Sequence, residues 1–377
     1  MTGMPAERQA RGRHNNFDLL RFIAALAVIF SHSFLIAEGT SVNEPLNRLT
    51  GNQCMLGLAG VFVFFAISGF LVTQSFEQTQ GPLRYLLKRC LRIFPGYLVM
   101  LVLSAFVLAP IVTTLPLAQY LGRPEPYRYV LDNAVFSLKV HELPGVMFVD
   151  NAVGLEINGS LWTLGIEFEM YLMVMALGML RLIRLPVCLL LVALGMASIH
   201  FDALNILGGW GWMLSFFAIG MTLYKLRETR IFDGRIALLA VAGLIASVPL
   251  GQFILLFPLF GCYLALYLAL QPRLPVIPAA RFGDLSYGLY IYGWPSQQAV
   301  IWLMKGHAAW WQVFLLASLL AGALAFLSWH LIEKRALSLK PGSGSWQGRG
   351  LAIRRWPWRP KSPSAATSPS RTPGLSS

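Results

Sequence analysis

The stretch Phe17–Phe34, FDLLRFIAALAVIFSHSF, is apolar enough to cross a lipid bilayer. It nevertheless carries Asp18, Arg21 and His32, and a charged side chain at the centre of a spanning helix costs about 2.5–3.5 kcal/mol on insertion scales. Arg21 and His32 are eleven residues apart, which places both on one helical face, about 16 Å apart along the axis. Taken singly, each residue has a plainer explanation: Arg21 as an arginine that reaches the lipid headgroups, and His32 as a histidine that hydrogen-bonds to a neighbouring helix. Their shared face favours one polar pocket or path inside the membrane.

The composition is that of a membrane protein. Of the 377 residues, 56% are hydrophobic and 12% are charged, whereas soluble domains carry about 25% charged residues. The formal charge of +13 is explained by Lys and Arg collecting in cytoplasmic loops, so we expect no nucleic-acid partner. The four cysteines share no metal-ligand spacing, and we expect neither a metal site nor a disulfide framework.

Runs of apolar residues predict an all-α integral membrane protein with about ten transmembrane helices. The predicted spans are 17–36, 55–75, 93–113, 161–180, 185–200, 208–225, 236–250, 252–270, 285–304 and 310–332. Basic residues collect in alternate connections, among them Arg84, Lys88, Arg181, Arg184, Lys225, Arg227, Lys334 and Arg335. The long connection 114–160 is an exception, and long loops weigh less in this rule. The pattern predicts cytoplasmic N- and C-termini.

The chain divides into three predicted parts. Residues 1–16 form a basic cytoplasmic arm, residues 17–335 a membrane domain, and residues 336–377 a disordered, basic cytoplasmic tail rich in Pro and Ser. A signal peptide is the alternative for the first span. Its length, its Arg and His, and the lack of a clear small-residue cleavage site favour a spanning helix.

A second polar group lies in Asn158–Tyr171, NGSLWTLGIEFEMY. Glu167 is predicted about 10 Å below the outer surface and His32 about 22 Å above the inner surface of a core about 30 Å thick. The two would then share one depth, and Tyr171 shares the helical face of Glu167. Such a pair suits a general base and the group that orients it. A purely structural buried pair is the alternative.

Other candidate residues lie in three further motifs. Arg89 and Arg92 share a helix face at the start of the predicted third span, and two guanidinium groups suit a phosphate-rich ligand. Topology signals are the alternative for this pair. Ser68 lies in GVFVFFAISGFLV, whose small residues allow helices to approach closely. Tyr287 and Tyr290 lie in GDLSYGLYIYGWPSQQ, a polar and aromatic patch for which an interfacial aromatic belt is the alternative.

Together and in this order, the motifs resemble those of the acyltransferase type 3 family of bacterial inner-membrane proteins, over about residues 14–335. The resemblance rests on the Arg21 and His32 pair, on FFAISGFL at 64–71, and on Arg89-x-x-Arg92 followed by IFP. It also rests on SLWTLGIEFEMY, with Glu167 at the family's Glu position, and on SYGLYIYGWP. The family often carries a His where this chain has Gly293, so a catalytic role at that position is not carried over.

The resemblance implies a membrane O-acyltransferase of the bacterial inner membrane. It would transfer an acyl group, by expectation acetyl, from cytoplasmic acyl-CoA to a sugar hydroxyl of a surface or exported glycan, with acyl-CoA as co-substrate and no other cofactor. The expected catalytic residues are His32 as general base, Glu167 as its orienting partner, and Arg21 as donor-binding or oxyanion-stabilising group. An acyl-histidine intermediate remains open. The expected donor- and substrate-binding residues are Arg89, Arg92, Ser68, Trp162, Tyr171, Tyr287 and Tyr290.

Partners implied by the resemblance are acyl-CoA, a glycan or lipid-linked sugar acceptor, and membrane lipids. Two other classes of protein use similar residues. A secondary transporter also needs intramembrane Glu, His and Arg, but the chain shows no inverted repeat. A lipid-binding membrane scaffold leaves the predicted matched depth of His32 and Glu167 unexplained.

Overall fold

The computed structural model describes residues 15–136, 142–146, 148, 151–153, 156–201, 209–271, 275 and 283–339. Their regular structure is helical, apart from one isolated β-bridge between Thr113 and Val146. Most of the predicted N-terminal arm and the tail from residue 340 lie outside the described residues. The three-part division of the chain therefore stays a prediction.

The first half of the chain forms helices on both sides of a long connection. They are α2 (Phe17–Glu38), α3 (Pro45–Leu49), α4 (Leu56–Gln78), α5 (Pro82–Leu103), the π-helical turn η1 (Ser104–Leu108), α6 (Ala109–Val112), α7 (Leu117–Leu121) and α8 (Glu125–Ala134). Local sequence explains several of their ends. Gly39 takes the left-handed conformation that ends α2, at φ 71°, and Pro82 occupies the first turn of α5.

The second half consists of longer apolar helices. They are α9 (Trp162–Met179), α10 (Leu185–Phe201), α11 (Gly209–Lys225), α12 (Gly234–Ser247), α13 (Phe253–Leu270), α14 (Ser286–Leu303), α15 (Trp310–Ser328), the π-helical turn η4 (Trp329–Glu333) and α16 (Lys334–Ser338). Asp233 caps α12, because its carboxylate accepts a hydrogen bond from the Arg235 backbone N–H at 2.8 Å.

Each predicted span overlaps a helical segment, although α5 begins at Pro82, eleven residues before the predicted span 93–113. Six helical segments of the described chain are long and apolar enough to cross a membrane: Phe17–Glu38, Leu56–Gln78, Pro82–Val112, Trp162–Met179, Phe253–Leu270 and Trp310–Ser338. Leu185–Phe201 and Gly234–Ser247 are shorter apolar helices. The all-helical fold and the multi-pass membrane character are thus confirmed, while the number of ten spans and the orientation of the termini stay predictions.

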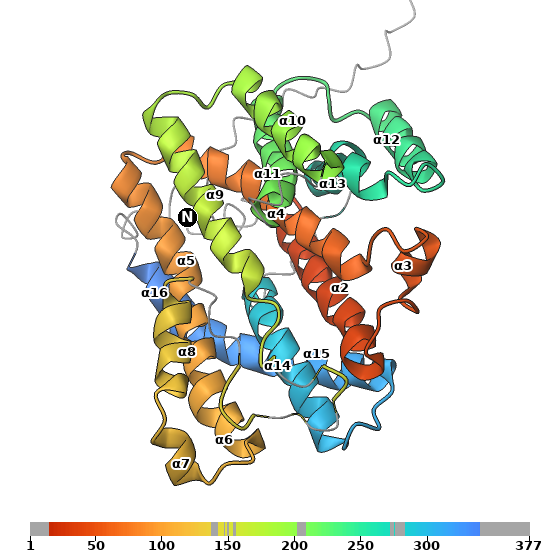
Figure 1. The fold of residues 1–377 in the computed structure, drawn as a ribbon. Coiled ribbons are helices and arrows are strands. Elements are labelled where there is room, and N and C mark those ends of the chain that lie inside the picture. The colour runs from red at the N-terminus through yellow and green to blue at the C-terminus, as the bar shows by residue number, and fades with distance from the viewer. Residues whose placement is uncertain are drawn as a thin grey trace, which may run out of the picture.

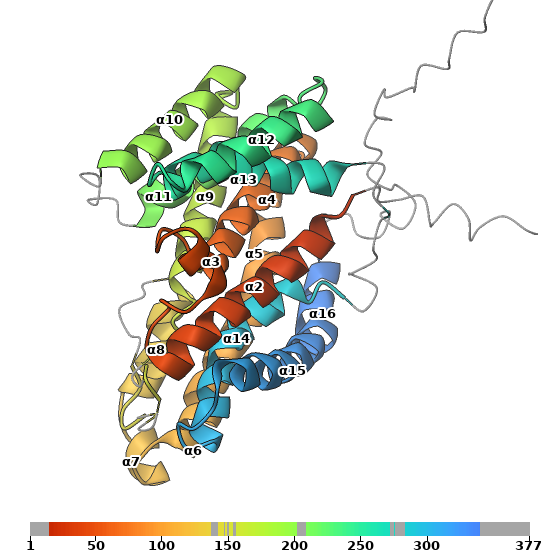
Figure 2. The same ribbon diagram turned by 90° about the vertical axis from the view of Figure 1, so that its right-hand side faces the viewer.

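Two groups of helices lie at opposite ends of the molecule, and α5 to α9 lie along one side of it (Figure 1). Helices α10–α13 gather at one end, with α12 beside α13 (Figure 2), and α14 and α15 lie at the other end. Helix α4 contacts the first group through α11 and α13, and it also contacts α2. Helix α2, which carries Arg21 and His32, packs between α4, α14 and α15. The polar face of α2 therefore lies inside the helix assembly.

Two glycines bring α4 and α11 into backbone contact. A Cβ atom on Gly69 would collide with the carbonyl oxygen of Phe217, and one on Gly220 with that of Ala66. Beside them, the rings of Phe62 and Phe216 stack with centroids 3.7 Å apart. Small residues at such crossings let membrane helices approach closely, as expected for the motif that contains Ser68.

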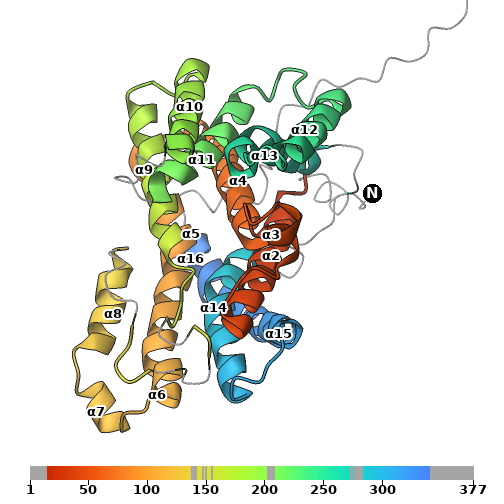
Figure 3. The ribbon, with the colours of Figure 1, turned by 45° about the vertical axis from the view of Figure 1, so that its right-hand side comes forward.

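The connection 114–160 is more than the plain loop that the charge pattern implies. Within it, α8 runs alongside α5 (Figure 3), and the Tyr97 hydroxyl donates a hydrogen bond to the Asn133 carbonyl at 3.0 Å. The Phe136 ring then packs against Phe94 and Phe168, at centroid distances of 5.3 and 5.4 Å. Since Phe168 adjoins Glu167, this connection reaches inward to the level of the candidate site.

Candidate active site

Glu167 on α9 is held by two hydroxyl groups. The Ser68 hydroxyl on α4 and the Tyr171 hydroxyl, one turn further along α9, both donate to Glu167 Oε1 at 2.6 Å. A carboxylate with two short charge-assisted hydrogen bonds is well compensated for its removal from water. The structure therefore brings together Ser68, Glu167 and Tyr171, three of the residues that the sequence selects.

Arg89 on α5 lies beside Tyr171, next to the hydroxyl groups that hold Glu167. Its guanidinium carbon lies 5.9 Å from the centre of the Tyr171 ring, and its Nη2 donates to Ser75 Oγ at 3.3 Å. Arg21 is also close enough to Tyr171 to act on it electrostatically. The Nε atom of Arg89 is buried and has no hydrogen-bond partner among the described residues. Arg89 thus keeps an unused donor for a ligand.

Arg92 has a different environment from Arg89, although it lies on the same helix face. Its guanidinium donates to Asp284 Oδ2 at 2.6 Å and lies 3.8 Å from Glu333 Oε2. It also lies 5.7 Å from the centre of the Tyr287 ring. Two carboxylates more than neutralise one guanidinium. In this arrangement Arg92 joins protein segments, whereas the sequence suggests that it binds phosphate.

Helix α14 continues the series of polar groups. The Tyr287 hydroxyl donates to the Ile93 carbonyl on α5 at 2.8 Å. The Tyr290 hydroxyl lies 2.5 Å from Thr163 Oγ1 and donates to the Ser160 carbonyl at 3.1 Å. These contacts place the start of α14 beside Arg92 and its middle beside the start of α9.

His32 lies further along the same helix pair. Its ring packs edge-on against Trp294 of α14, with centroids 4.9 Å apart, and it is half-buried. The Trp294 indole N–H donates to the Glu156 carbonyl at 3.2 Å. Nearby, the Gln297 amide donates to Ser33 Oγ and to the Ile29 carbonyl of α2, at 2.8 and 2.7 Å. His32 therefore lies beside the segment that precedes α9.

The structure does not pair His32 with Glu167. Among the described residues, Glu167 makes its hydrogen bonds to Ser68 and Tyr171, and His32 packs against Trp294. From Trp294 to Tyr290, and from Thr163 to Glu167, the helices each advance about 6 Å at 1.5 Å per residue. Along these two helices the positions of Trp294 and Glu167 therefore differ by about 12 Å, so the contacts of His32 and Glu167 do not show the matched depth that the sequence predicts.

Two further sequence positions gain a structural explanation. Trp162 is exposed and packs over Gly209 of α11, where a Cβ atom would meet its ring at 2.8 Å. It lies outside the polar cluster. At Gly293, a Cβ atom would lie 2.9 Å from Ile29 Cγ1. Close packing of α14 on α2 therefore explains why this position holds no larger side chain.

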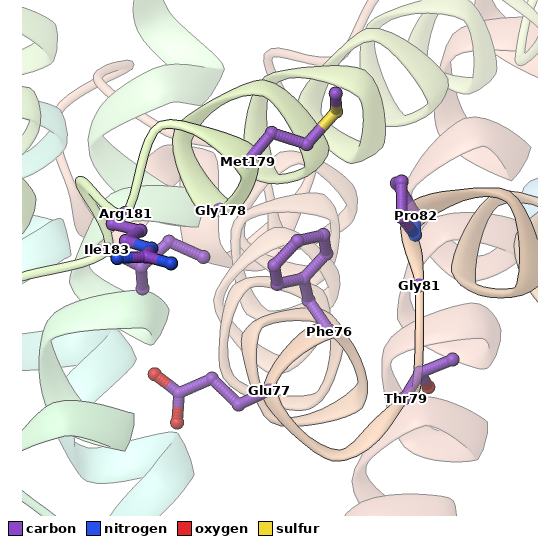
Figure 4. A pocket seen from close by; sticks show the side chains of 9 residues that line it. All are labelled: Phe76, Glu77, Thr79, Gly81, Pro82, Gly178, Met179, Arg181 and Ile183. Carbon is purple, nitrogen blue, oxygen red and sulfur yellow. The ribbon is translucent and has the colours of Figure 1, made fainter.

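A pocket of about 410 Å³ opens where α4 and α9 end (Figure 4). Its walls include Phe76, Glu77, Met179 and Arg181. It belongs to the same end of the molecule as Arg89, because Ser75 of α4 accepts the hydrogen bond from Arg89. None of the residues selected from the sequence lines it.

Sequence reasoning missed the two acids that hold Arg92. Asp284 directly precedes the SYGLY motif, and Glu333 follows the apolar run of α15 in the sequence HLIEKR. Glu333 is 2% exposed and accepts a hydrogen bond from Ser328 Oγ at 2.9 Å. The sequence did offer a sign of this pairing, because an acidic residue at the end of a membrane-spanning segment usually has a basic partner.

Comparisons with known proteins agree with the fold and with these motifs. The family model described as "Acyltransferase domain" matches residues 14–332. The chain is 27% identical to an O-acetyl transferase of Shigella phage Sf6 over 341 residues, which cover 86% of this chain and 97% of the relative. It is 28% identical to nodulation protein 10 of Rhizobium leguminosarum bv. viciae over 371 residues, which cover 89% and 96%.

No solved structure matches the chain. The similarity covers nearly the whole length of both relatives, and the family match includes helices α2 to α15. The comparisons do not support the transporter or scaffold alternatives. With its motifs, its apolar helices and the family match together, the chain belongs to the acyltransferase family and is a multi-pass membrane acyltransferase.

Proposed function

We propose that the protein transfers an acetyl group from cytoplasmic acetyl-CoA to a sugar hydroxyl of an exported glycan at the bacterial inner membrane. Acetyl is supported by the name of the phage relative, O-acetyl transferase. The CoA donor and the glycan acceptor follow from the resemblance of the motifs. The sidedness follows from the alternation of basic connections along the chain.

The observation that carries the proposal is a series of polar side chains between Arg89 and His32. It runs from Arg89 through Tyr171, Glu167 and Ser68, and continues on α14 through Tyr290 to Trp294 and His32. Polar groups at these depths are costly in a bilayer and usually line a substrate path. A path of this kind lets a donor enter at one end and an acceptor at the other.

Arg89 would bind the donor. CoA carries a pyrophosphate and a 3′-phosphate, and a guanidinium binds phosphate oxygens in a bidentate manner. Within the described residues, Arg89 has a buried N–H without a hydrogen-bond partner, whereas Arg92 is paired with Asp284 and Glu333. Arg21, on the face of α2 that also carries His32 but about 16 Å away along the helix axis, would add positive charge for the phosphates of the donor at the Arg89 end of the path.

His32 would act as the general base. The sugar hydroxyl oxygen attacks the thioester carbonyl carbon while its proton passes to the His32 imidazole. The C–S bond then breaks, and the imidazolium returns the proton to the thiolate, which leaves as free CoA. Glu167 holds Ser68 and Tyr171 in place beside Arg89 and balances positive charge along the path.

The proposal is tested with the purified protein in lipid nanodiscs. We would measure free thiol release from acetyl-CoA with and without an acceptor, here glycan extracted from the source strain after deletion of the gene. Acceptor-dependent CoA release, with the acetyl ester found on the glycan by mass spectrometry, is the expected result. Intact acetyl-CoA in the presence of folded protein and acceptor would contradict the proposal.

A further inference from the structure

Side chains of α14 hold the segment that precedes α9 beside His32. The Gln298 amide donates to the carbonyl oxygens of Val153 and Glu156, at 2.5 and 2.9 Å. Asn151 donates to Gln298 Oε1 at 2.6 Å, and the Trp294 indole donates to the Glu156 carbonyl at 3.2 Å. Two side chains of one helix thus hold the backbone at Glu156, which fixes where its side chain begins.

The Glu156 carboxylate lies next to the aromatic ring that contacts His32. A Cβ atom on Gly159 would lie 2.6 Å from Glu156 Oε2 and 2.8 Å from the Trp294 ring. The carboxylate and the ring therefore lie on either side of the same position, and the Trp294 ring also packs edge-on against His32. Any side chain at position 159 would separate them, so glycine here allows the close approach.

Glu156 differs from Glu167 and Glu333 in that its carboxylate has no partner among the described residues. It is exposed, and within the described part of the chain its carboxylate makes no hydrogen bond or ion pair. Glu167 and Glu333, by contrast, each accept hydrogen bonds from hydroxyl groups. A fixed, exposed and unpaired carboxylate keeps its full capacity to accept hydrogen bonds from a ligand.

We propose that Glu156 binds hydroxyl groups of the acceptor sugar and so presents one of them to His32. This inference rests on the proposed function and assigns the acceptor side of that site. A carboxylate accepts hydrogen bonds from sugar hydroxyls and repels the phosphates of CoA, so Glu156 suits the acceptor and disfavours the donor. The same charge favours neutral sugars or amino sugars over uronic acids.

In this proposal Glu156 contributes to catalysis by holding the acceptor in place and takes no part in the chemical step. Holding an acceptor hydroxyl at the base raises its effective concentration there, and this effect is lost when the holding group is removed. Glu156→Gln keeps the size of the side chain and removes the charge. Because the backbone carbonyl of Glu156 makes the contacts that hold the segment, the substitution leaves those contacts in place.

The experiment measures acetyl transfer in nanodiscs from radiolabelled acetyl-CoA to glycan extracted from the gene-deleted source strain. We expect Glu156→Gln to raise the KM for the glycan about 10- to 100-fold, the usual effect of losing one or two hydrogen bonds to a charged group. The KM for acetyl-CoA stays unchanged. Glu156→Asp recovers part of the acceptor affinity, and Glu142→Gln, at another exposed glutamate of the same connection, is the matched control.

A second measurement needs only the wild-type protein. Glucosamine should compete with the glycan, and glucuronate at the same concentration should not, since its carboxylate is repelled by Glu156. An unchanged glycan KM in folded Glu156→Gln, or equal competition by the two sugars, would overturn the role of Glu156 while acetyl transfer itself continued. A wild-type protein that transfers no acetyl group would overturn the proposed function instead.

Discussion

At the residue scale, two arginines one helical turn apart have different roles because their neighbours differ. Arg89 faces a tyrosine ring and a serine hydroxyl, whereas Arg92 faces two carboxylates. Helical spacing in the sequence makes them equivalent, since both lie on one face of α5. The acids that distinguish them come from residues 284 and 333, far away in the chain.

Arg89→Ala is predicted to raise the KM for acetyl-CoA about tenfold or more, because a bidentate phosphate contact is lost. Arg89→Lys should recover little, since an ammonium does not reproduce the planar fork of donors. Initial rates of CoA release at varied donor concentration provide the measurement. If Arg89→Ala had a normal KM for acetyl-CoA, Arg89 would not bind the donor and would serve only to orient the chain in the membrane.

His32→Gln is predicted to lower acetyl transfer about 10²–10⁴-fold, because an amide does not take up a proton at neutral pH. Glu167→Gln should be milder, since its amide oxygen still accepts hydrogen bonds from Ser68 and Tyr171. Rates are compared per folded protein, with size-exclusion profiles as the control. Near wild-type transfer by folded His32→Gln would exclude it as the base.

At the scale of helices, Arg92 joins three elements: α5, the residues before α14, and the π-helical turn η4. Arg92→Ala would leave the buried Glu333 without its cation, and breaking a buried ion pair costs about 3–5 kcal/mol. Arg92→Ala with Glu333→Gln should recover much of that free energy of unfolding, because no uncompensated buried charge remains. Thermal unfolding in detergent, followed by tryptophan fluorescence, measures the difference. A double variant no more stable than Arg92→Ala would contradict this coupling.

The crossing of α4 and α11 depends on Gly69 and Gly220. An alanine at either position would meet a backbone carbonyl of the other helix, so the helices would have to separate, at a cost of about 1–3 kcal/mol. Gly322→Ala on α15 is the control, since no atom lies within 4 Å of the added Cβ. We expect folded yield and melting temperature to fall for Gly69→Ala and Gly220→Ala and to stay unchanged for the control.

At the scale of the whole molecule, the proposed chemistry requires the Arg89 end and the His32 end to face opposite compartments. Reporter insertions at Arg123, between α7 and α8, and after residue 339 should therefore report opposite sides of the membrane. Enzymatic reporters active only in the periplasm or only in the cytoplasm make this measurement. If both insertions reported the same compartment, the proposed direction of transfer would be wrong.

The helices of this protein follow from its sequence because apolar length and polar breaks are local properties. Each predicted span from 17–36 to 310–332 overlaps a helical segment, and the ordered motifs identify the family. The shared face of Glu167 and Tyr171 was also predictable, since side chains four residues apart meet on one helix. Their hydrogen bond confirms it.

Contacts between helices were decided by the tertiary structure. Periodicity assigns a face and a position within one helix, but the offset of one helix against another depends on packing. The offset of α9 against α14 places His32 beside Trp294 and away from Glu167. The partners of Arg92 and the position of Glu156 were also decided by the tertiary structure. Both depend on segments far apart in the sequence, and no local pattern predicts that these segments meet.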